Sequence, residues 1–221
     1  MKQLSFNAPI KAAVLVSGGG TNLQALIDGQ RTGRIKNFEI ALVVSSKDGA
    51  YALERAWNSG IPATVLPRKG ATEEGYDRQM DALLSRYDID LVITSGFLSI
   101  LGEKVLSRFE NAIINIHPSL IPSFCGKGYY GLRVHEKALE YGVRVSGATV
   151  HFVSAEVDGG PIILQKAVDV LDDDTPESLQ QRIMVNCEQQ LLPEAVSLFC
   201  EGRLEIDGRI VRIKPEEETN G

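Results

Sequence analysis

Short apolar, β-branched runs recur along the chain and alternate with longer stretches that have helical periodicity. Because the runs are almost continuously hydrophobic, both faces of each strand should be covered, as they are when helices flank a parallel sheet. The alternation therefore predicts an α/β fold with a mostly parallel, doubly wound sheet. Its strands are expected at residues 12–17, 40–45, 63–66, 91–95 and 112–116.

The stretches between these runs predict helices. Their expected positions are residues 22–30, 50–59, 72–87 and 102–109. In the first of them Leu23, Leu26 and Ile27 form one apolar stripe, which is typical of a helix that packs one face on a sheet. The pattern changes after the fifth strand, because residues 119–131 carry three glycines and a proline and predict a loop.

The C-terminal half predicts a different arrangement. A helix at residues 134–141 is followed by two strand-like runs, 148–153 and 162–170, which predict an antiparallel extension of the sheet. A long helix from Thr175 to about Glu201 should then cover it.

The last segment alternates apolar and polar residues over 204–213 around Asp207, which precedes a glycine, and predicts a hairpin. Residues 214–221 are expected to form a frayed tail. Since the sequence has no internal repeat or linker, we expect one domain over residues 1–221 with a core at about 11–202.

Composition limits the partners. A formal net charge of −6 argues against a nucleic-acid partner, because binding to a phosphate backbone usually needs a basic face. The three cysteines lack paired spacing, so neither a disulfide framework nor a thiolate metal site is expected. The sequence also has no signal-peptide pattern and no run of about 18 apolar residues. We therefore expect a cytoplasmic protein without a membrane partner.

The first candidate site is the segment Ser-Gly-Gly-Gly-Thr-Asn at residues 17–22, between the first predicted strand and helix. Glycines let the backbone expose N–H groups, and a helix N-terminus adds partial positive charge, so the segment can bind a phosphate. The alternative is a tight turn in which Thr21 caps the helix. A dinucleotide fingerprint is not supported, because Leu23 stands where its third glycine would be.

The second candidate is the pair Asn115 and His117 at the end of the fifth predicted strand. Ligands of open α/β sheets bind at that edge, and residues two apart on an extended chain point the same way. Both side chains can donate a hydrogen bond to one oxygen, although a histidine with a simple backbone contact would give the same pattern. His135 and His151 are interpreted as structural.

The third candidate is Asp158, in the turn Glu-Val-Asp-Gly-Gly-Pro at residues 156–161. Asp-Gly is a common turn pair, which gives the carboxylate a structural interpretation. It could instead orient an imidazole and favour its protonated form. The sequence leaves both interpretations open.

Together these segments resemble a known family. SGGGTNLQALID, the run around Phe97, NIHPSLIPSF and GATVHFVSAEVDGGPIILQ are similar to segments of the phosphoribosylglycinamide formyltransferases, folate-dependent enzymes of purine synthesis. The resemblance runs from about Lys11 to Gly202. Its Asn-x-His-Pro-Ser and Asp-Gly-Gly-Pro elements also occur in formyltransferases that act on methionyl-tRNA and in a formyl-folate hydrolase, whereas the glycine loop points to the ribonucleotide acceptor. The resemblance implies a Rossmann-like formyltransferase fold.

The resemblance implies that a formyl group passes from the co-substrate 10-formyltetrahydrofolate to the amine of 5-phosphoribosylglycinamide, without a metal. Asn115, His117 and Asp158 would be catalytic. The first two would stabilise the oxyanion of the tetrahedral centre, and Asp158 would keep His117 charged. The partners would be these small molecules, and the oligomeric state is not implied.

The resemblance also implies the binding residues. Gly20, Thr21 and Asn22 would hold the acceptor's phosphate and Glu188 its ribose. Two segments would form the walls of the folate pocket. They are Phe97, Leu98, Ser99, Ile100 and Leu101, and Ser154, Ala155, Glu156 and Val157 up to Asp158.

Two features depart from the family pattern. Many relatives have arginine where Ser99 stands and a basic residue near Glu73, so we expect the ionic contacts to the folate tail to differ. The loop at residues 124–131 is longer than in the short-loop members. Its Lys127 could supply positive charge or could simply be solvated.

Four alternatives stay open, the first of which is a formyltransferase that acts on a different amine acceptor. The same trio could hydrolyse formyl-folate, although a hydrolase has no phosphorylated acceptor to hold. Cys125, eight positions after His117, could be a nucleophile with that histidine as its base. The glycine loop alone could serve a nucleotide-binding or regulatory module, which would leave the trio unexplained.

Overall fold

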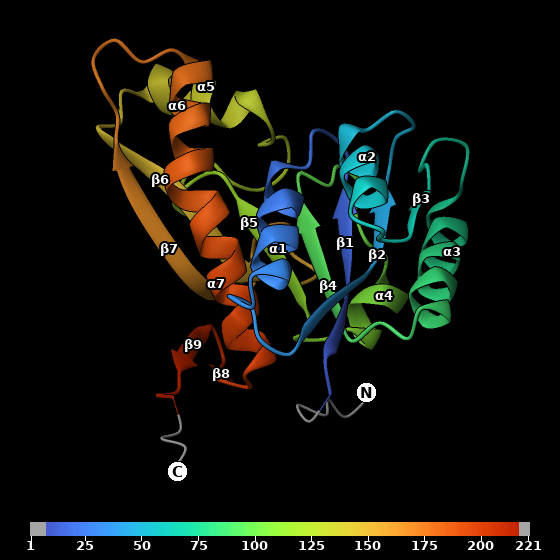
Figure 1. The fold of residues 1–221 in the computed structure, drawn as a ribbon. Coiled ribbons are helices and arrows are strands. Elements are labelled where there is room, and N and C mark those ends of the chain that lie inside the picture. The colour runs from blue at the N-terminus through green and yellow to red at the C-terminus, as the bar shows by residue number, and fades with distance from the viewer. Residues whose placement is uncertain (1–7, 217–221) are drawn as a thin grey trace.

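A nine-stranded sheet forms the centre of the computed structural model, which describes residues 8–216. The strand order is β3-β2-β1-β4-β5-β6-β7-β9-β8 (Figure 1). The strands are β1 (Ile10–Val16), β2 (Phe38–Ser45), β3 (Ala63–Val65), β4 (Leu91–Ser95), β5 (Ile113–His117), β6 (Val145–Phe152), β7 (Ile162–Asp169), β8 (Leu204–Asp207) and β9 (Ile210–Ile213).

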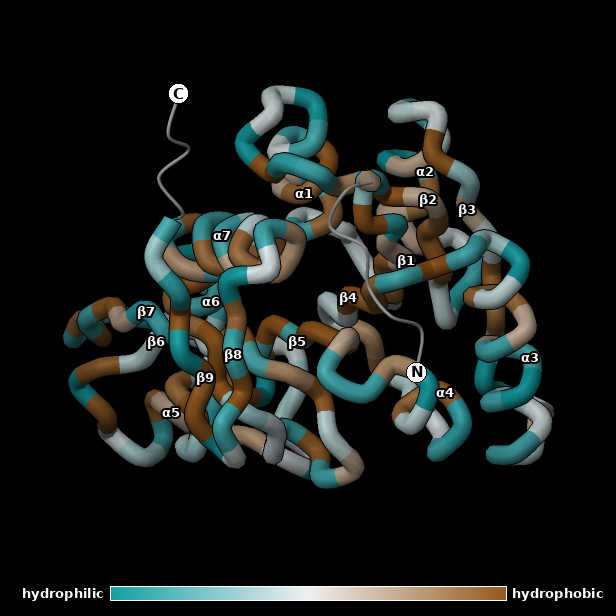
Figure 2. The backbone as a smooth tube through the Cα atoms, turned by 90° about the horizontal axis from the view of Figure 1, so that it is seen from below, coloured by the Kyte–Doolittle hydropathy of each residue, from teal (hydrophilic) through white to brown (hydrophobic). Residues whose placement is uncertain are grey.

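The first five strands pair in parallel, as the apolar runs predict. Leu15, Val43 and Ile93 are fully buried within them, because helices cover both faces of this part of the sheet. Figure 2 shows α1, α2 and α7 on one side and α3, α4 and α5 on the other. The connecting helices are α1 (Thr21–Arg31), α2 (Tyr51–Asn58), α3 (Glu73–Arg86), α4 (Glu103–Arg108) and α5 (Leu132–Tyr141).

The antiparallel extension is also confirmed. β6 pairs antiparallel with β5 and with β7, and the β8–β9 hairpin joins the same sheet through the parallel pair Ile162 and Ile210. Gly208 in the hairpin turn has a φ of +60°, which glycine adopts readily. The sheet is therefore mixed, with β5 at the boundary between its parallel and antiparallel halves.

The predicted long C-terminal helix is confirmed over residues 176–200, and it contains a π-helical segment. α6 (Pro176–Ile183) begins after Thr175, whose side chain accepts a hydrogen bond from the backbone N–H of Ser178. A π-helical segment, η1 (Met184–Glu188), then separates it from α7 (Gln189–Cys200). Apolar periodicity does not reveal such a segment, because a π turn changes the helical register only locally. It ends at Glu188, so it sets the direction of that side chain.

The last described residues follow the hairpin. The backbone N–H of Lys214 donates to the carbonyl of Arg203 at 2.8 Å, so this part of the predicted tail is bonded to the protein. Residues 217–221 of that tail lie outside the described residues. Within residues 8–216, no helix combines the length and apolarity needed to cross a membrane.

Candidate active site

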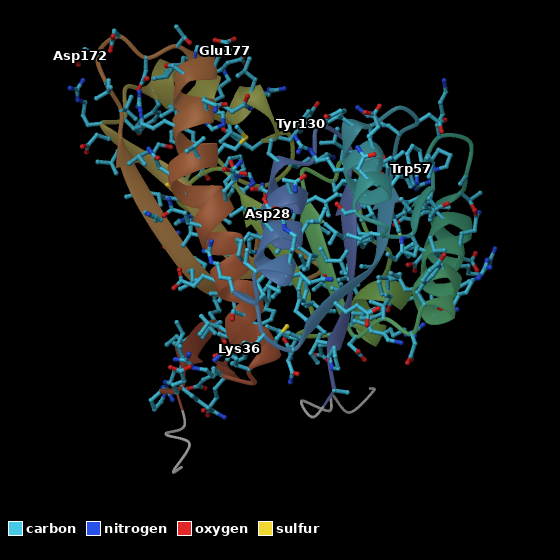
Figure 3. All side chains as sticks on the ribbon, viewed as in Figure 1. Asp28, Lys36, Trp57, Tyr130, Asp172 and Glu177 are labelled. Carbon is cyan, nitrogen blue, oxygen red and sulfur yellow. The ribbon has the colours of Figure 1, made fainter. Side chains whose placement is uncertain are left out.

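A cavity of about 770 Å³ lies at the C-terminal edge of β1, β4 and β5. Figure 3 labels one of its lining residues, Tyr130, above the ends of these strands. Every residue predicted for the catalytic, acceptor and folate sites lines this cavity, together with Lys127 of the long loop. The structure therefore brings the separate sequence motifs to one place.

The glycine loop opens α1 without a side-chain cap. Gly20 is the N-cap residue, with a φ of 71°, and a Cβ on it would lie 2.6 Å from the Cβ of Ala52. Both the backbone conformation and the close approach of α2 thus require glycine. Thr21 is the first helical residue, so the interpretation in which it caps the helix is wrong. The backbone N–H groups of the first turn are left for a ligand, as in an anion site.

Asn22 connects this helix end to the π-helical segment. Its Nδ2 donates to Oε2 of Glu188 at 2.7 Å. Burial raises the pKa of Glu188, and the bond from Asn22 opposes that rise. Oδ1 of Asn22 is buried and has no partner within residues 8–216. Oδ1 of Asn22 and the carboxylate of Glu188 therefore present acceptors that suit the hydroxyl groups of a sugar.

Arg55 adds positive charge beside the glycine loop. Its Nε donates to the carbonyl of Gly19 at 2.9 Å, its Nη1 donates to Oε1 of Gln24 at 3.1 Å, and its guanidinium lies 4.9 Å from the ring centre of Tyr51. Arg55 was not predicted from the sequence, because its contact with the loop depends on how α2 packs.

The loop after β4 forms the second wall of the cavity. The N–H of Leu98 donates to Oγ of Ser17 at 3.0 Å, which ties this wall to the glycine loop. Leu98 and Ile100 expose 48% and 71% of their surfaces, and Val157 across the cavity exposes 46%. Such exposed apolar side chains at the mouth of a cavity suit a flat aromatic ligand. Ser99 lines the cavity between them.

Asn115 is held by partners on both neighbouring strands. Oγ1 of Thr94 donates to Oδ1 of Asn115 at 2.7 Å, and Nδ2 of Asn115 lies 3.0 Å from Nε2 of His151. Nδ1 of His151 lies 2.8 Å from the carbonyl of Phe152, and a carbonyl only accepts, so Nδ1 carries the hydrogen. In this tautomer Nε2 is left to accept a hydrogen bond from the Asn115 amide. These bonds fix which end of the Asn115 side chain is the donor.

His151, interpreted as structural from the sequence, lines the cavity and contacts Asn115. It is buried, with 1% of its surface exposed, and lies opposite Asn115 in the antiparallel pairing of β5 and β6. No spacing in the sequence could have revealed this contact, since it depends on the register of two strands separated by a loop and a helix.

Asp158 lies between two imidazoles. Its Oδ2 is 3.7 Å from Nδ1 of His117, and its Oδ1 is 3.7 Å from Nε2 of His151. The N–H of Gly126 also donates to Oδ2 at 2.8 Å. Nε2 of His117 lies 2.9 Å from the carbonyl of Phe124 and so carries a hydrogen. The carboxylate is thus placed to interact with a positive charge on either ring.

Close packing fixes the turn that carries Asp158. A Cβ on Gly160 would lie 1.8 Å from the carbonyl oxygen of Phe152, so only glycine allows the turn to approach β6 this closely. Asp158 itself has a φ of 55°, a left-handed conformation that aspartate tolerates better than most residues.

The charge state of His117 differs from the expectation. Burial lowers the pKa of His117, and the attraction of Asp158 and the bond to Phe124 do not fully offset this effect. The lowered pKa favours the neutral ring at neutral pH, which does not support the expectation that Asp158 keeps His117 substantially charged. For Asp158, burial raises the pKa, but its contacts with His151, His117 and Gly126 together lower it below the ordinary value.

Polar side chains of β6 and β7 fix the chain after His117. Oγ1 of Thr149 donates to the carbonyl of Ser119 at 2.7 Å and accepts from the N–H of Ile121 at 3.1 Å. Nε2 of Gln165 donates to the carbonyl of Ile121 at 3.0 Å. The loop that covers the cavity therefore starts from a fixed position.

Cys125 has no contact that would activate it. Its Sγ donates to the carbonyl of Pro122 at 3.3 Å. Burial raises the pKa of the thiol, and the nearby carboxylates of Asp158 and Glu156 raise it further. Since a thiolate is the nucleophilic form, this environment disfavours covalent catalysis through Cys125.

His135, interpreted as structural, also lines the cavity but is fully buried. Burial and the nearby His117 lower the pKa of His135 to about 4, so its ring is neutral at neutral pH. Within the described part of the chain, no group of three or more histidine, cysteine or acidic side chains could hold a metal ion.

A family model described as "Formyl transferase" matches residues 10–196, which includes the whole parallel half of the sheet and the residues around the cavity. The chain belongs to the formyl transferase family. The matched region contains Asn115, His117 and Asp158, which line the cavity.

Several relatives match over most of this formyl transferase chain. The phosphoribosylglycinamide formyltransferase of Escherichia coli is 39% identical over 194 residues, which cover 87% of this chain and 88% of that protein. The crystal structure of glycinamide ribonucleotide transformylase 1 from Symbiobacterium toebii is 46% identical, with a TM-score of 0.88, and the match covers 94% of this chain and 95% of that one.

Other matches carry less information. A formyltetrahydrofolate deformylase from Pseudomonas syringae is 23% identical over 95% of this chain and 67% of its own, with a TM-score of 0.85, which shows the shared fold alone. The chain spans 62–66% of the length of two plant chloroplast phosphoribosylglycinamide formyltransferases and 14–20% of animal trifunctional purine biosynthetic proteins that it matches.

Proposed function

We propose that this enzyme transfers the formyl group of 10-formyltetrahydrofolate to the amine of 5-phosphoribosylglycinamide in de novo purine synthesis. The products are formylglycinamide ribonucleotide and tetrahydrofolate. The observation that carries the proposal is one cavity lined by an uncapped helix N-terminus, an apolar wall and the cluster of Asn115, His117 and Asp158. The names of the full-length bacterial relatives support the same acceptor.

The acceptor lies at the α1 side of the cavity in this proposal. Its phosphate binds the backbone N–H groups of Gly20, Thr21 and Asn22, where the dipole of α1 and the charge of Arg55 favour an anion. Its ribose hydroxyls donate to Glu188, which Asn22 already holds in place. The amine then points toward β5.

The folate binds along the wall of the cavity that lies opposite the acceptor. Its pteridine packs between the exposed side chains of Leu98, Ile100 and Val157, and backbone groups of residues 97–101 and 154–157 bond to the ring. Serine at position 99 gives no charge to the folate tail, whereas the exposed Lys127 lines the same cavity.

The first chemical step is attack of the acceptor's amine on the formyl carbon. The carbonyl oxygen becomes negative in the tetrahedral centre, so catalysis requires donors that are already oriented toward it. The Asn115 amide is such a donor, since one of its two N–H groups bonds to His151 and the other is left for the oxyanion.

The second step moves a proton from the amine to the folate nitrogen. Neutral His117 has a lone pair on Nδ1, because its hydrogen is on Nε2 at the carbonyl of Phe124. Nδ1 accepts the amine proton, and Asp158 stabilises the imidazolium that forms. The charged ring then stabilises the oxyanion beside Asn115 and gives its proton to the departing nitrogen.

The remaining inferences concern the protein as a whole. We infer that one domain carries this reaction, because all nine strands share one sheet. We also infer a cytoplasmic enzyme with small-molecule partners and no nucleic-acid partner, which the acidic composition and the unpaired cysteines support. The co-substrate in this proposal is a folate, and the reaction uses no metal ion.

The experiment uses 10-formyltetrahydrofolate labelled with ¹³C in the formyl group and the purified protein, with and without 5-phosphoribosylglycinamide. We expect the label in formylglycinamide ribonucleotide, detected by mass spectrometry, and no label release without the acceptor. Label recovered as free formate at the same rate in both reactions would instead identify a hydrolase.

A further inference from the structure

We infer that Thr94 is a positioning residue for formyl transfer, because its hydroxyl holds the Asn115 amide with an N–H toward the reacting oxygen. This inference rests on the proposed function, in which Asn115 stabilises the oxyanion. Thr94 was not predicted from the sequence, and it acts through Asn115.

The position of Thr94 is fixed by the sheet. It is the fourth residue of β4 and pairs with Asn115 of β5 in the parallel register, so the two side chains lie on the same face. Only 7% of its surface is exposed. Its Oγ1 lies 2.7 Å from Oδ1 of Asn115 and 3.5 Å from the carbonyl of Ile114. The short contact makes Oδ1 the main acceptor for the hydroxyl.

The hydroxyl determines the orientation of the amide together with His151. A rotated amide would place Oδ1 of Asn115 against Nε2 of His151, and two acceptors would then face each other. The ring cannot relieve this by moving its hydrogen to Nε2 without losing the bond from Nδ1 to the carbonyl of Phe152. The observed orientation satisfies Thr94, Asn115 and His151 at once.

Removing the hydroxyl leaves neither orientation satisfied. In Thr94→Val, Oδ1 of Asn115 loses its donor while the side chain keeps nearly the same shape. The amide then spends part of its time with no N–H directed at the oxyanion. Because that contact forms mainly in the transition state, the loss should lower kcat and leave both KM values nearly unchanged.

The experiment compares Thr94→Val, Thr94→Ser and a control, Thr32→Val, in steady-state assays with both substrates. Thr32 bonds to the carbonyl of Asp28 at the end of α1, outside this cavity, so its substitution also removes one threonine hydroxyl. We expect Thr94→Val to lower kcat about five- to tenfold, and the other two variants to stay within about twofold of the parent.

A double variant tests the route of the effect. In an Asn115→Ala background, Thr94→Val should change the residual rate by less than about twofold, because there is no amide left to orient. An additional five- to tenfold loss in that background would show that Thr94 acts by another route and would overturn the inference.

Three further results would also overturn it. These are full activity in Thr94→Val, equal impairment in Thr94→Ser, and a loss confined to KM. If Thr94→Val fails to fold by thermal melting, Thr94→Ala provides the same comparison with Thr94→Ser. A near-normal Asn115→Ala enzyme would refute the proposed chemistry itself, whereas a severe loss there with normal Thr94→Val would refute the positioning inference alone.

Discussion

The two halves of the sheet contribute different kinds of group to one cavity. From the parallel half come the N-terminus of α1 and the loop after β4, where backbone N–H groups and apolar side chains face the cavity. From the antiparallel half come the buried His151 and the half-buried Asp158, whose Nε2 and Oδ1 atoms lie 3.7 Å apart. The difference indicates that the parallel half mainly binds substrates and that the boundary strand β5, supported by β6, performs the chemistry.

The largest expected effect lies at the boundary strand. Asn115→Ala and His117→Ala should each lower kcat by about a hundredfold or more, because they remove the oxyanion donor and the proton carrier. The acceptor's dissociation constant, measured by calorimetry, should change little. Near-normal turnover in either variant would remove that residue from the mechanism.

Substitution of Asp158, in the antiparallel half, should lower the rate by a smaller factor. Asp158 raises the pKa of His117, so Asp158→Asn should lower that pKa further below its usual value. The neutral ring is the proton acceptor, and activity is lost as pH falls through its pKa. The acidic limb of the pH profile of kcat/KM should therefore move to lower pH, while the maximum falls by about tenfold.

The direction of this shift is the informative result. If the acidic limb of the pH profile stays in place in Asp158→Asn, the carboxylate has a purely structural role. A rate that rises as pH falls would show that the charged ring is the resting catalytic form.

Substitutions in the parallel half should change substrate binding more than the rate of the chemical step. Asn22→Ala, or a valine at Gly20, should raise the acceptor's KM by about tenfold and change the folate's KM much less. Asn58→Ala, on the exposed end of α2, is the matched control for a lost asparagine. Inorganic phosphate should compete with the acceptor. Competition with the folate would mean that the two sites were assigned in reverse.

The smallest effect is expected at Cys125. Its thiol has a raised pKa and bonds to a backbone carbonyl, so Cys125→Ser should keep activity within about twofold. A folded but inactive variant, with a formyl adduct on Cys125 of the parent enzyme in mass spectra, would require a covalent mechanism.

Prediction from the sequence was most accurate for strands that are buried on both faces. The run at residues 91–95 forms β4 with the predicted bounds, because a run buried on both faces cannot shift without exposing apolar side chains. The family resemblance assigns the motifs around Gly20, Asn115 and Asp158 to one active site, and they line one cavity.

Features that depend on tertiary packing were not predictable in this way. His151 contacts Asn115 only through the register of β5 and β6, and Thr94 does so only through that of β4 and β5. The π turn before Glu188 leaves no mark in the apolar pattern. The lowered pKa of His117 follows from burial, which outweighs the carboxylate that the sequence suggested.

The central claim is that both substrates bind side by side and that the amine attacks directly. The most direct test measures initial rates of tetrahydrofolate release over a grid of both substrate concentrations, including zero acceptor. We predict intersecting double-reciprocal lines, typical of a ternary complex, and no release without the acceptor. Equal release without the acceptor, or the parallel lines of a ping-pong mechanism, would contradict the account.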